Sequence, residues 1–173
     1  MPNITDIIKK ASLREDSVTL YLAGKEAAEV ARLERQLADL SGDAWAPTSM
    51  ADRSPAAEIA KKIEAARKRI AGSAVEFKMR ALGAEEWSDL VAAHPSADKT
   101  QRWDPATFGP ACVVASCYEP AMTAEQCAAL YAVLNTGQRE DLENCAFEVN
   151  ATATSVPFSV SASAILAAST ELS

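Results

Sequence analysis

Apolar and polar residues alternate in two short stretches of the chain, and each stretch predicts a β-strand. The first covers residues 18–22 and the second residues 75–80. Each has three apolar positions spaced two apart, which places them on one face of a strand. We expect the strands to pair through these positions: Val18, Leu20, Leu22, Val75, Phe77 and Met79.

Between the two strands the apolar spacing changes to that of an α-helix. One narrow stripe runs through residues 25–41, and a second follows Ser54-Pro55, a pair typical of a helix N-cap and first helical position. Two long helices with narrow stripes and a short connection predict an antiparallel hairpin, which either covers the sheet or projects from it. The stripes consist of Val30, Leu33, Leu37, Leu40, Ile59, Ile63, Ala66 and Ile70.

Helices are also predicted outside this unit. At the N-terminus, Ile4, Ile7 and Ile8 predict one helical turn that docks on the body. After the second strand we expect a helix over 85–93, and then a turn at 105–109 with a short buried helix from Pro110. Thr123 and Gln126 form a capping box for a helix to about residue 134. Further helices are expected at 138–150, with Leu142, Cys145, Ala146 and Val149 inward, and, weakly, at 161–169.

These elements predict an α+β fold that is mostly helical. A small two-stranded antiparallel sheet with an inserted helical hairpin, plus the helix at 85–93, makes a first subdomain over residues 1–94. An acidic, alanine-rich helical subdomain with a flexible C-terminal tail takes up residues 95–173. Because a two-stranded sheet is marginal alone, we expect the helix at 85–93, and a partner chain, to cover its apolar face.

Composition and charge narrow the classes of function. Much of the 49% hydrophobic content is alanine, which buries little area, so seven large aromatic side chains should carry the packing. Residues 1–82 hold 14 Lys and Arg against 12 Asp and Glu, a net +2, whereas residues 83–173 hold 3 against 12, a net −9. An acidic half argues against nucleic acid as the partner. The aromatic residues are Trp45, Trp87, Trp103, Phe77, Phe108, Phe147 and Phe158.

The chain lacks the sequence signs of export or membrane insertion. Its first ten residues do not follow the order of a secretory signal, and no run is long enough to span a bilayer. We therefore expect no membrane association, and reduced, buried thiols in a cytoplasmic protein. The four cysteines are Cys112, Cys117, Cys127 and Cys145.

No motif in the sequence indicates catalysis or a cofactor. The single histidine, His94, precedes Pro95 and is expected to end a helix. Cys112 and Cys117 lack a second ligand pair at zinc spacing. The carboxylate clusters at 85–86 and 140–143 are expected to form solvated helix faces. With no glycine-rich phosphate loop or nucleophile motif either, we expect no enzyme, metal or cofactor.

The apolar stripes are a stronger signal than any of these polar groups. The strand face and the hairpin are more hydrophobic than so small a sheet can bury, which leaves two interpretations open: packing within the chain, or an interface with another copy or a client. The candidate interface residues are Leu33, Leu37, Ile59, Ile63, Phe77 and Met79.

Six short phrases follow one another along the chain: VEFKMRAL (75–82), EEWSDLVAAHP (85–95), WDPATFGPACVVASC (103–117), EPAMTAEQ (119–126), LNTGQREDL (134–142) and VPFS (156–159). In this order the phrases resemble the tail assembly chaperones of long-tailed (siphovirus) phages of actinobacteria. The resemblance covers about residues 18–165 and is strongest from Val75 to Phe158, whereas the N-terminal hairpin matches only in pattern.

This resemblance implies a late phage protein that acts in the host cell cytoplasm and is not kept in the mature virion. Such chaperones bind the tape measure protein, keep that long helical client soluble and help tail tube protein assemble on it. The family also implies a frameshift-extended form, of which this chain would be the short version, and it has no catalytic residues. The sequence leaves two other functions open: a structural virion protein of the tail or head–tail connector, and an adaptor or regulator that binds a host protein.

Overall fold

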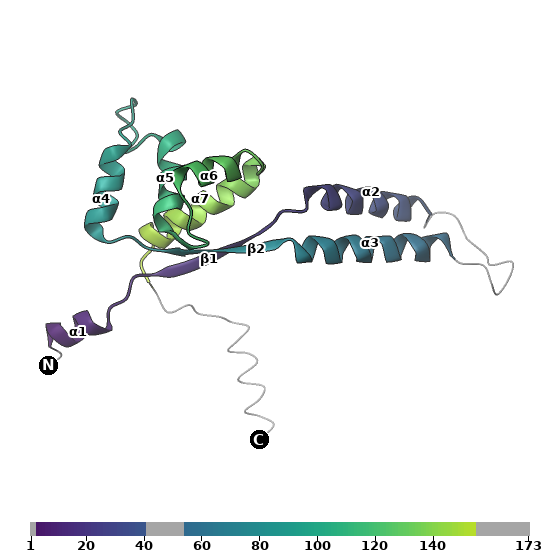
Figure 1. The fold of residues 1–173 in the computed structure, drawn as a ribbon, viewed down its shortest axis with the longest axis horizontal. Coiled ribbons are helices and arrows are strands. Elements are labelled where there is room, and N and C mark those ends of the chain that lie inside the picture. The colour runs from purple at the N-terminus through teal and green to yellow at the C-terminus, as the bar shows by residue number, and fades with distance from the viewer. Residues whose placement is uncertain (1–2, 41–53, 155–173) are drawn as a thin grey trace, which may run out of the picture.

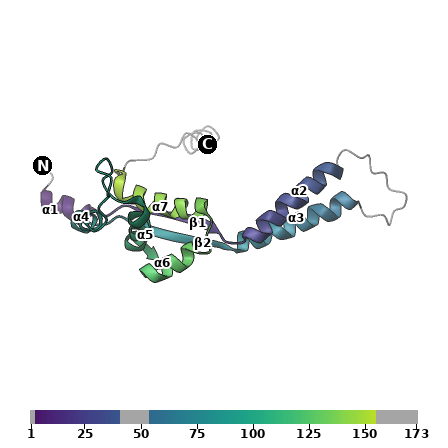
Figure 2. The same ribbon diagram turned by 90° about the horizontal axis from the view of Figure 1, so that it is seen from above.

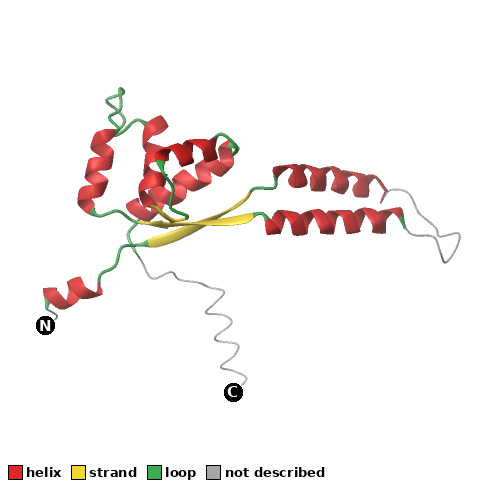
Figure 3. Cartoon of the chain, viewed as in Figure 1, coloured by secondary structure: helices red, strands yellow, loops and turns green. Residues whose placement is uncertain are grey.

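A three-stranded antiparallel sheet organises this protein, whose computed structural model describes residues 3–40 and 54–154. The strands are β1 (Glu15–Tyr21), β2 (Ala74–Arg80) and β3 (Cys117–Glu119), in the order β1-β2-β3. Figure 3 shows that most of the described chain is nevertheless helical. The helices are α1 (Ile4–Lys10), α2 (Gly24–Leu40), α3 (Pro55–Gly72), α4 (Ala84–Ala93), α5 (Pro105–Ser116), α6 (Ala124–Tyr131) and α7 (Thr136–Ala151). The predicted class, mostly helical α+β, is confirmed.

The pairing of the two predicted strands is also confirmed. β1 and β2 run antiparallel, with Val18 opposite Phe77 and Leu20 opposite Val75. Leu22 lies beyond the end of β1 and is 45% exposed, so its predicted place on the apolar face is wrong. The strand ends before Leu22 because the chain there turns toward α2.

The prediction of a sheet with only two strands is wrong, because β3 adds to the free edge of β2. Met79 pairs with Cys117, and Lys78 pairs with Glu119 across a register shift. A 3.0 Å ion pair between Lys78 and Glu119 reinforces this edge. Three residues are too few to show an alternating pattern, so sequence alone did not reveal the strand.

The predicted turn at Gly109-Pro110 is wrong as well, because α5 is one continuous helix from Pro105. Asp104 caps it, and its carboxylate accepts a hydrogen bond from the Ala106 N–H. Pro110 has no N–H, so the Ala106 carbonyl lacks its usual helical donor. The helix tolerates this loss because α5 lies in the core, where Phe108, Cys112 and Val113 are buried.

The core lies between one face of the sheet and the helices α5 and α7. Phe77 and Met79 on the central strand are buried among residues of both helices, while Glu76 and Lys78 point to the polar face. One apolar and one wet face is usual for an antiparallel sheet. The core cluster draws on both predicted subdomains; its buried members are Leu20, Phe77, Met79, Phe108, Cys112, Val113, Cys117, Cys127, Leu134, Leu142, Ala146 and Val149.

Four of the predicted aromatic residues form one cluster that holds α4 to the rest. Trp103 stacks on Phe108 with ring centres 4.5 Å apart, and Trp87 meets Phe108 edge-on at 5.5 Å. Phe147 of α7 contacts both tryptophans. Aromatic contacts of this kind add to the free energy gained by burial alone. Trp45 and Phe158 lie outside the described residues, as does the weak helix predicted at 161–169.

Asn150 of α7 joins three segments through its side-chain amide. Its Oδ1 accepts a hydrogen bond from the Leu82 N–H at 2.7 Å, and its Nδ2 donates to Ser116 Oγ at 2.9 Å and to the Ala146 carbonyl. At the other end of α7, Gln138 Nε2 donates to the Tyr21 carbonyl at 2.8 Å. These bonds fix α7 against both strand ends. We call the sheet with α4–α7 the head.

The predicted hairpin projects from the head and does not cover the sheet. α2 and α3, which we call the arm, lie side by side and extend beyond the end of β1 and β2 (Figure 1). Ser54 caps α3 as predicted, with Pro55 at its first position. Leu33, Ile63 and Ala66 are buried between the helices. Ion pairs of Arg67 with Glu34 (2.9 Å) and Arg69 with Glu29 (3.1 Å) cross the arm.

The N-terminal helix α1 does not dock on the body, so that prediction is wrong. It lies beyond the opposite end of the sheet from the arm, as Figures 1 and 2 show. None of its residues is buried, and the side chains of Ile4, Ile7 and Ile8 are 65%, 49% and 65% exposed. The helix is nonetheless well formed, since Asn3 caps it through the Thr5 N–H.

The remaining helices follow their predicted signals closely. The capping box at Thr123 and Gln126 opens α6, which ends at Tyr131, three residues earlier than predicted. Asn135 and Gln138 form a second capping box that opens α7, whose inward residues Leu142, Ala146 and Val149 are buried as predicted. Cys145, also predicted inward, is only partly buried.

Candidate binding sites

An apolar groove of about 640 Å³ lies between α5 and α6. None of the side chains along it is Lys, Arg, Asp or Glu, and five are alanines, so its floor is shallow and uncharged. Mostly apolar hollows with few polar groups are typical ligand or peptide sites. The lining residues are His94, Ala106, Thr107, Pro110, Ala111, Val114, Ala115, Ala124, Cys127, Ala128 and Tyr131.

Two polar groups lie in this apolar wall. The hydroxyl of Tyr131 is buried and lacks a hydrogen bond of good geometry within the described chain, although Glu143 and Cys127 lie beside it. Burial, and secondarily the charge of Glu143, raises the pKa of Tyr131, so the phenol stays protonated and can donate. Ala106 also lines the groove, and its carbonyl lacks the helical donor that Pro110 would otherwise supply. A partner in the groove would therefore gain mainly apolar contact, because the Tyr131 hydroxyl is buried beneath the surface.

An adjoining cavity of about 350 Å³ continues the groove toward α7. It shares Ala106, Pro110 and Tyr131 with the groove and adds Arg139, Glu140 and Glu143. The Glu143 carboxyl group lies so close to α5 that a Cβ added at Gly109 would come within 2.7 Å of it. A glycine at this helix position therefore lets α7 approach α5. Arg139, Glu140 and Glu143 give the groove a charged rim at this end.

The thiols are suited to packing and not to nucleophilic chemistry. Cys112, Cys117 and Cys127 are buried and free, as predicted, while Cys145 is partly exposed. Burial raises the pKa of Cys127 in the groove wall and raises that of Cys112 to about 11. Because the thiolate is the reactive form, these side chains are unreactive at neutral pH.

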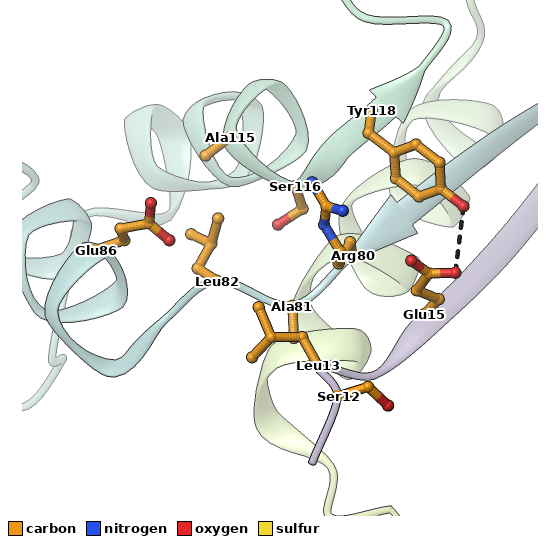
Figure 4. A pocket seen from close by; sticks show the side chains of 10 residues that line it. All are labelled: Ser12, Leu13, Glu15, Arg80, Ala81, Leu82, Glu86, Ala115, Ser116 and Tyr118. Carbon is orange, nitrogen blue, oxygen red and sulfur yellow. Dashed lines mark hydrogen bonds between the residues drawn. The ribbon is translucent and has the colours of Figure 1, made fainter. Parts of the chain in front are cut away.

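A second pocket, of about 470 Å³, lies where β1 and β2 meet α4 and α5. Figure 4 shows Glu86 at one end of it and Tyr118 with Glu15 at the other. The Arg80 guanidinium lies 5.3 Å from the centre of the Tyr118 ring, and the Tyr118 hydroxyl donates to Glu15 at 3.4 Å. Glu86 accepts the Gly83 N–H and so caps α4. The charged groups that line this second pocket thus have partners within the chain, which favours a structural role for the pocket.

The residues predicted as a client or oligomer interface do not form one exposed surface. Phe77 and Met79 are buried in the head, at 4% and 0% exposure. The apolar strand face therefore packs against its own chain, and the prediction that these two residues form an interface is wrong. Leu33 and Ile63 are buried between the helices of the arm. Leu37 and Ile59 are partly buried along the same seam.

Other polar candidates have local structural roles. His94 caps the end of α4, as predicted: its N–H donates to the Val91 carbonyl, and its ring meets Phe108 edge-on. No group of His, Cys, Asp or Glu in residues 3–40 and 54–154 has an arrangement that could hold a metal ion. None of the helices in these ranges combines the length and the apolar character needed to cross a membrane.

Sequence reasoning missed the groove, although the sequence does carry a signal for it. Ala106, Pro110, Ala111, Val114 and Ala115 are small or β-branched residues at spacings of four, one, three and one, which is one face of a helix. That pattern was hidden because Gly109-Pro110 predicted a turn.

Comparisons of the chain with protein-family models, with curated proteins and with solved structures found no match.

Proposed function

We propose that this protein is a phage tail assembly chaperone that binds the tape measure protein through the groove between α5 and α6. The uncharged groove is the observation that carries the proposal. An amphipathic helix binds a groove of this kind by placing side chains at i, i+3, i+4 and i+7 along its floor. The tape measure protein is the client that the family resemblance implies, and it is long and helical.

Several features of the head support a binding role over a catalytic one. The groove walls offer shallow alanine surface, one buried phenol and one backbone carbonyl, which suits a helix whose side chains vary. Outside the groove, the chain from residue 83 onward holds 3 Lys and Arg against 12 Asp and Glu. A strongly acidic exterior would keep a complex with an apolar client in solution. In this proposal the protein acts in the host cytoplasm and is absent from the finished virion.

The test is co-expression with the tape measure protein encoded beside this chain, comparing two neighbouring alanines. Both Ala128 and Ala129 are exposed on α6, but only Ala128 lines the groove. Ala128→Asp should cut recovery of soluble client complex at least tenfold, because it places a charge on the apolar floor. Ala129→Asp should leave recovery unchanged, and both variants should melt like the wild type.

Two outcomes would contradict the proposal. If the client stays insoluble with the wild-type protein and no complex co-purifies, the chaperone function fails. If both alanine variants behave alike, the client binds elsewhere. Abundant peptides from this chain in purified virions would favour a structural tail or connector protein instead.

A further inference from the structure

The N-terminal helix α1 carries an apolar stripe that no residue of the ranges 3–40 and 54–154 covers. Ile4, Ile7, Ile8 and Ala11 are spaced i, i+3, i+4 and i+7, the anchor spacing of a helix that lies in a groove. All four are exposed. A helix of seven residues is too short to be stable alone in water, so its formation calls for a surface to pack against.

We infer that α1 of one copy docks in the α5–α6 groove of a second copy. The shapes complement each other, because three branched isoleucine side chains meet a floor built from five alanines. The uncharged α5–α6 groove thus provides one half of an interface, and the exposed apolar helix α1 provides the other.

The charges are complementary as well. Lys9 and Lys10 lie in the last turn of α1, against a single carboxylate at Asp6. The segment that holds both groove helices, residues 104–131, contains three carboxylates and neither Lys nor Arg. The adjoining cavity adds Glu140 and Glu143 at the rim, against one cation at Arg139. Opposite charges around an apolar contact fix the orientation of the docked helix.

The chain geometry favours a second copy over the same chain. Arg14 is fixed to the head, since its carbonyl accepts the Ala81 N–H and its side chain reaches the Thr152 carbonyl. Only residues 11–13 separate this anchor from α1, and three residues span about 10 Å at most. Along the long axis of the molecule, α4 and α5 lie between α1 and α6 (Figures 1 and 2).

The first experiment measures the molar mass of the full chain in solution over a range of concentrations, with no client present. The wild type should be a dimer or larger. Ile7→Asp should be a monomer, whereas Thr5→Asp, on the polar face of α1, should keep the mass of the wild type. Since no residue of α1 is buried in its own chain, both variants should keep the circular dichroism spectrum of the folded wild type.

The second experiment locates the contact. A benzophenone amino acid at Lys9, beside the stripe, is introduced into both light and ¹⁵N-labelled copies, which are mixed unfolded and refolded together. Photo-adducts should fall on α5 or α6 and join light to heavy peptides. Adducts within one isotope form only would place α1 on its own chain, and adducts on other elements would rule out the groove.

A monomeric wild type without adducts between copies would overturn the inference. The docked α1 and a client helix would occupy the same groove, so a client would have to displace α1 in order to bind. Neither experiment contains a client, so such a result would leave the proposed chaperone function standing. Conversely, failure to bind the tape measure protein would not disturb the docking of α1.

Discussion

Cys112 shows how burial changes the chemistry of a single residue in this core. Its thiol is 1% exposed, and its Sγ lies 3.6 Å from the Ala146 carbonyl of α7. Desolvation raises its pKa from 9.0 to about 11, and the charge of Glu143 adds to the rise while the hydroxyl of Ser116 opposes it. The neutral thiol is therefore favoured in the folded protein at a pH where it would ionise in an unfolded chain.

This shift predicts a loss of stability at alkaline pH. Below pH 9 the thiol is neutral in both states and contributes no pH dependence. Between pH 9 and 11 the unfolded chain loses the proton first, so the free energy of unfolding falls as pH rises, by up to about 3 kcal/mol in total. Urea unfolding at pH 8 and 10.5 measures this loss. In Cys112→Ala it should be smaller by about 2 kcal/mol, and an equal loss in both proteins would contradict the assignment.

At the scale of elements, the arm is a unit that packs mainly on itself. The buried side chains of α2 and α3 face one another, and the ion pairs of the arm join the same two helices. No helix of the head packs over the seam, which is why Leu37 and Ile59 stay partly exposed. The arm can therefore unfold without the head.

A charge at Leu33 should show this independence. Leu33→Asp would place an unpaired carboxylate between the helices of the arm, at a cost of about 3 kcal/mol or more. Amide hydrogen exchange should become fast across 24–40 and 55–72, while β2, α5 and α7 keep their protection. Asp at the exposed neighbour Arg32 serves as the control. Equal loss of protection in the head would show that arm and head fold together.

Elements whose apolar pattern repeats several times were predictable from sequence. Short elements, and those whose pattern is interrupted, were not. The stripes of α2 and α3 and the alternation in β1 and β2 each repeat three or more times, which is enough to fix type and register. β3 has three residues, and Gly109-Pro110 in α5 carries a local signal for a turn that burial overrides. The Asn150 hydrogen bonds could not be foreseen, because they join segments 34 and 68 residues apart.

At the scale of the whole molecule, the central strand joins both halves of the chain in one core. Phe77 lies on β2, between β1 from the N-terminal half and β3 from the acidic half. The site follows from this arrangement: β2 carries α5 and α7 on one face, α6 packs against α5, and the groove forms between α5 and α6. Sequence could not predict that meeting, because it depends on packing of elements that are distant in the chain.

Phe77→Asp should therefore destabilise the entire head. An unpaired carboxylate at this buried position should cost about 3 kcal/mol or more of unfolding free energy. Thermal and urea unfolding, followed by circular dichroism, measure the change. Val133→Asp makes the same replacement at a side chain that is 79% exposed, and it should unfold like the wild type. If Phe77→Asp did so too, the strand face would not be the core of the protein in solution.

The join between arm and sheet also determines how the molecule would respond to tension. Only Ser73 separates α3 from β2, and its hydroxyl accepts the Ala23 N–H and donates to the Ile70 carbonyl, while its own carbonyl accepts the Leu22 N–H. Both strands thus enter the arm on the same side of the head through a bonded joint. A pull along the arm would load β1 and β2 together, shearing them against β3 and α7 without peeling one from the other.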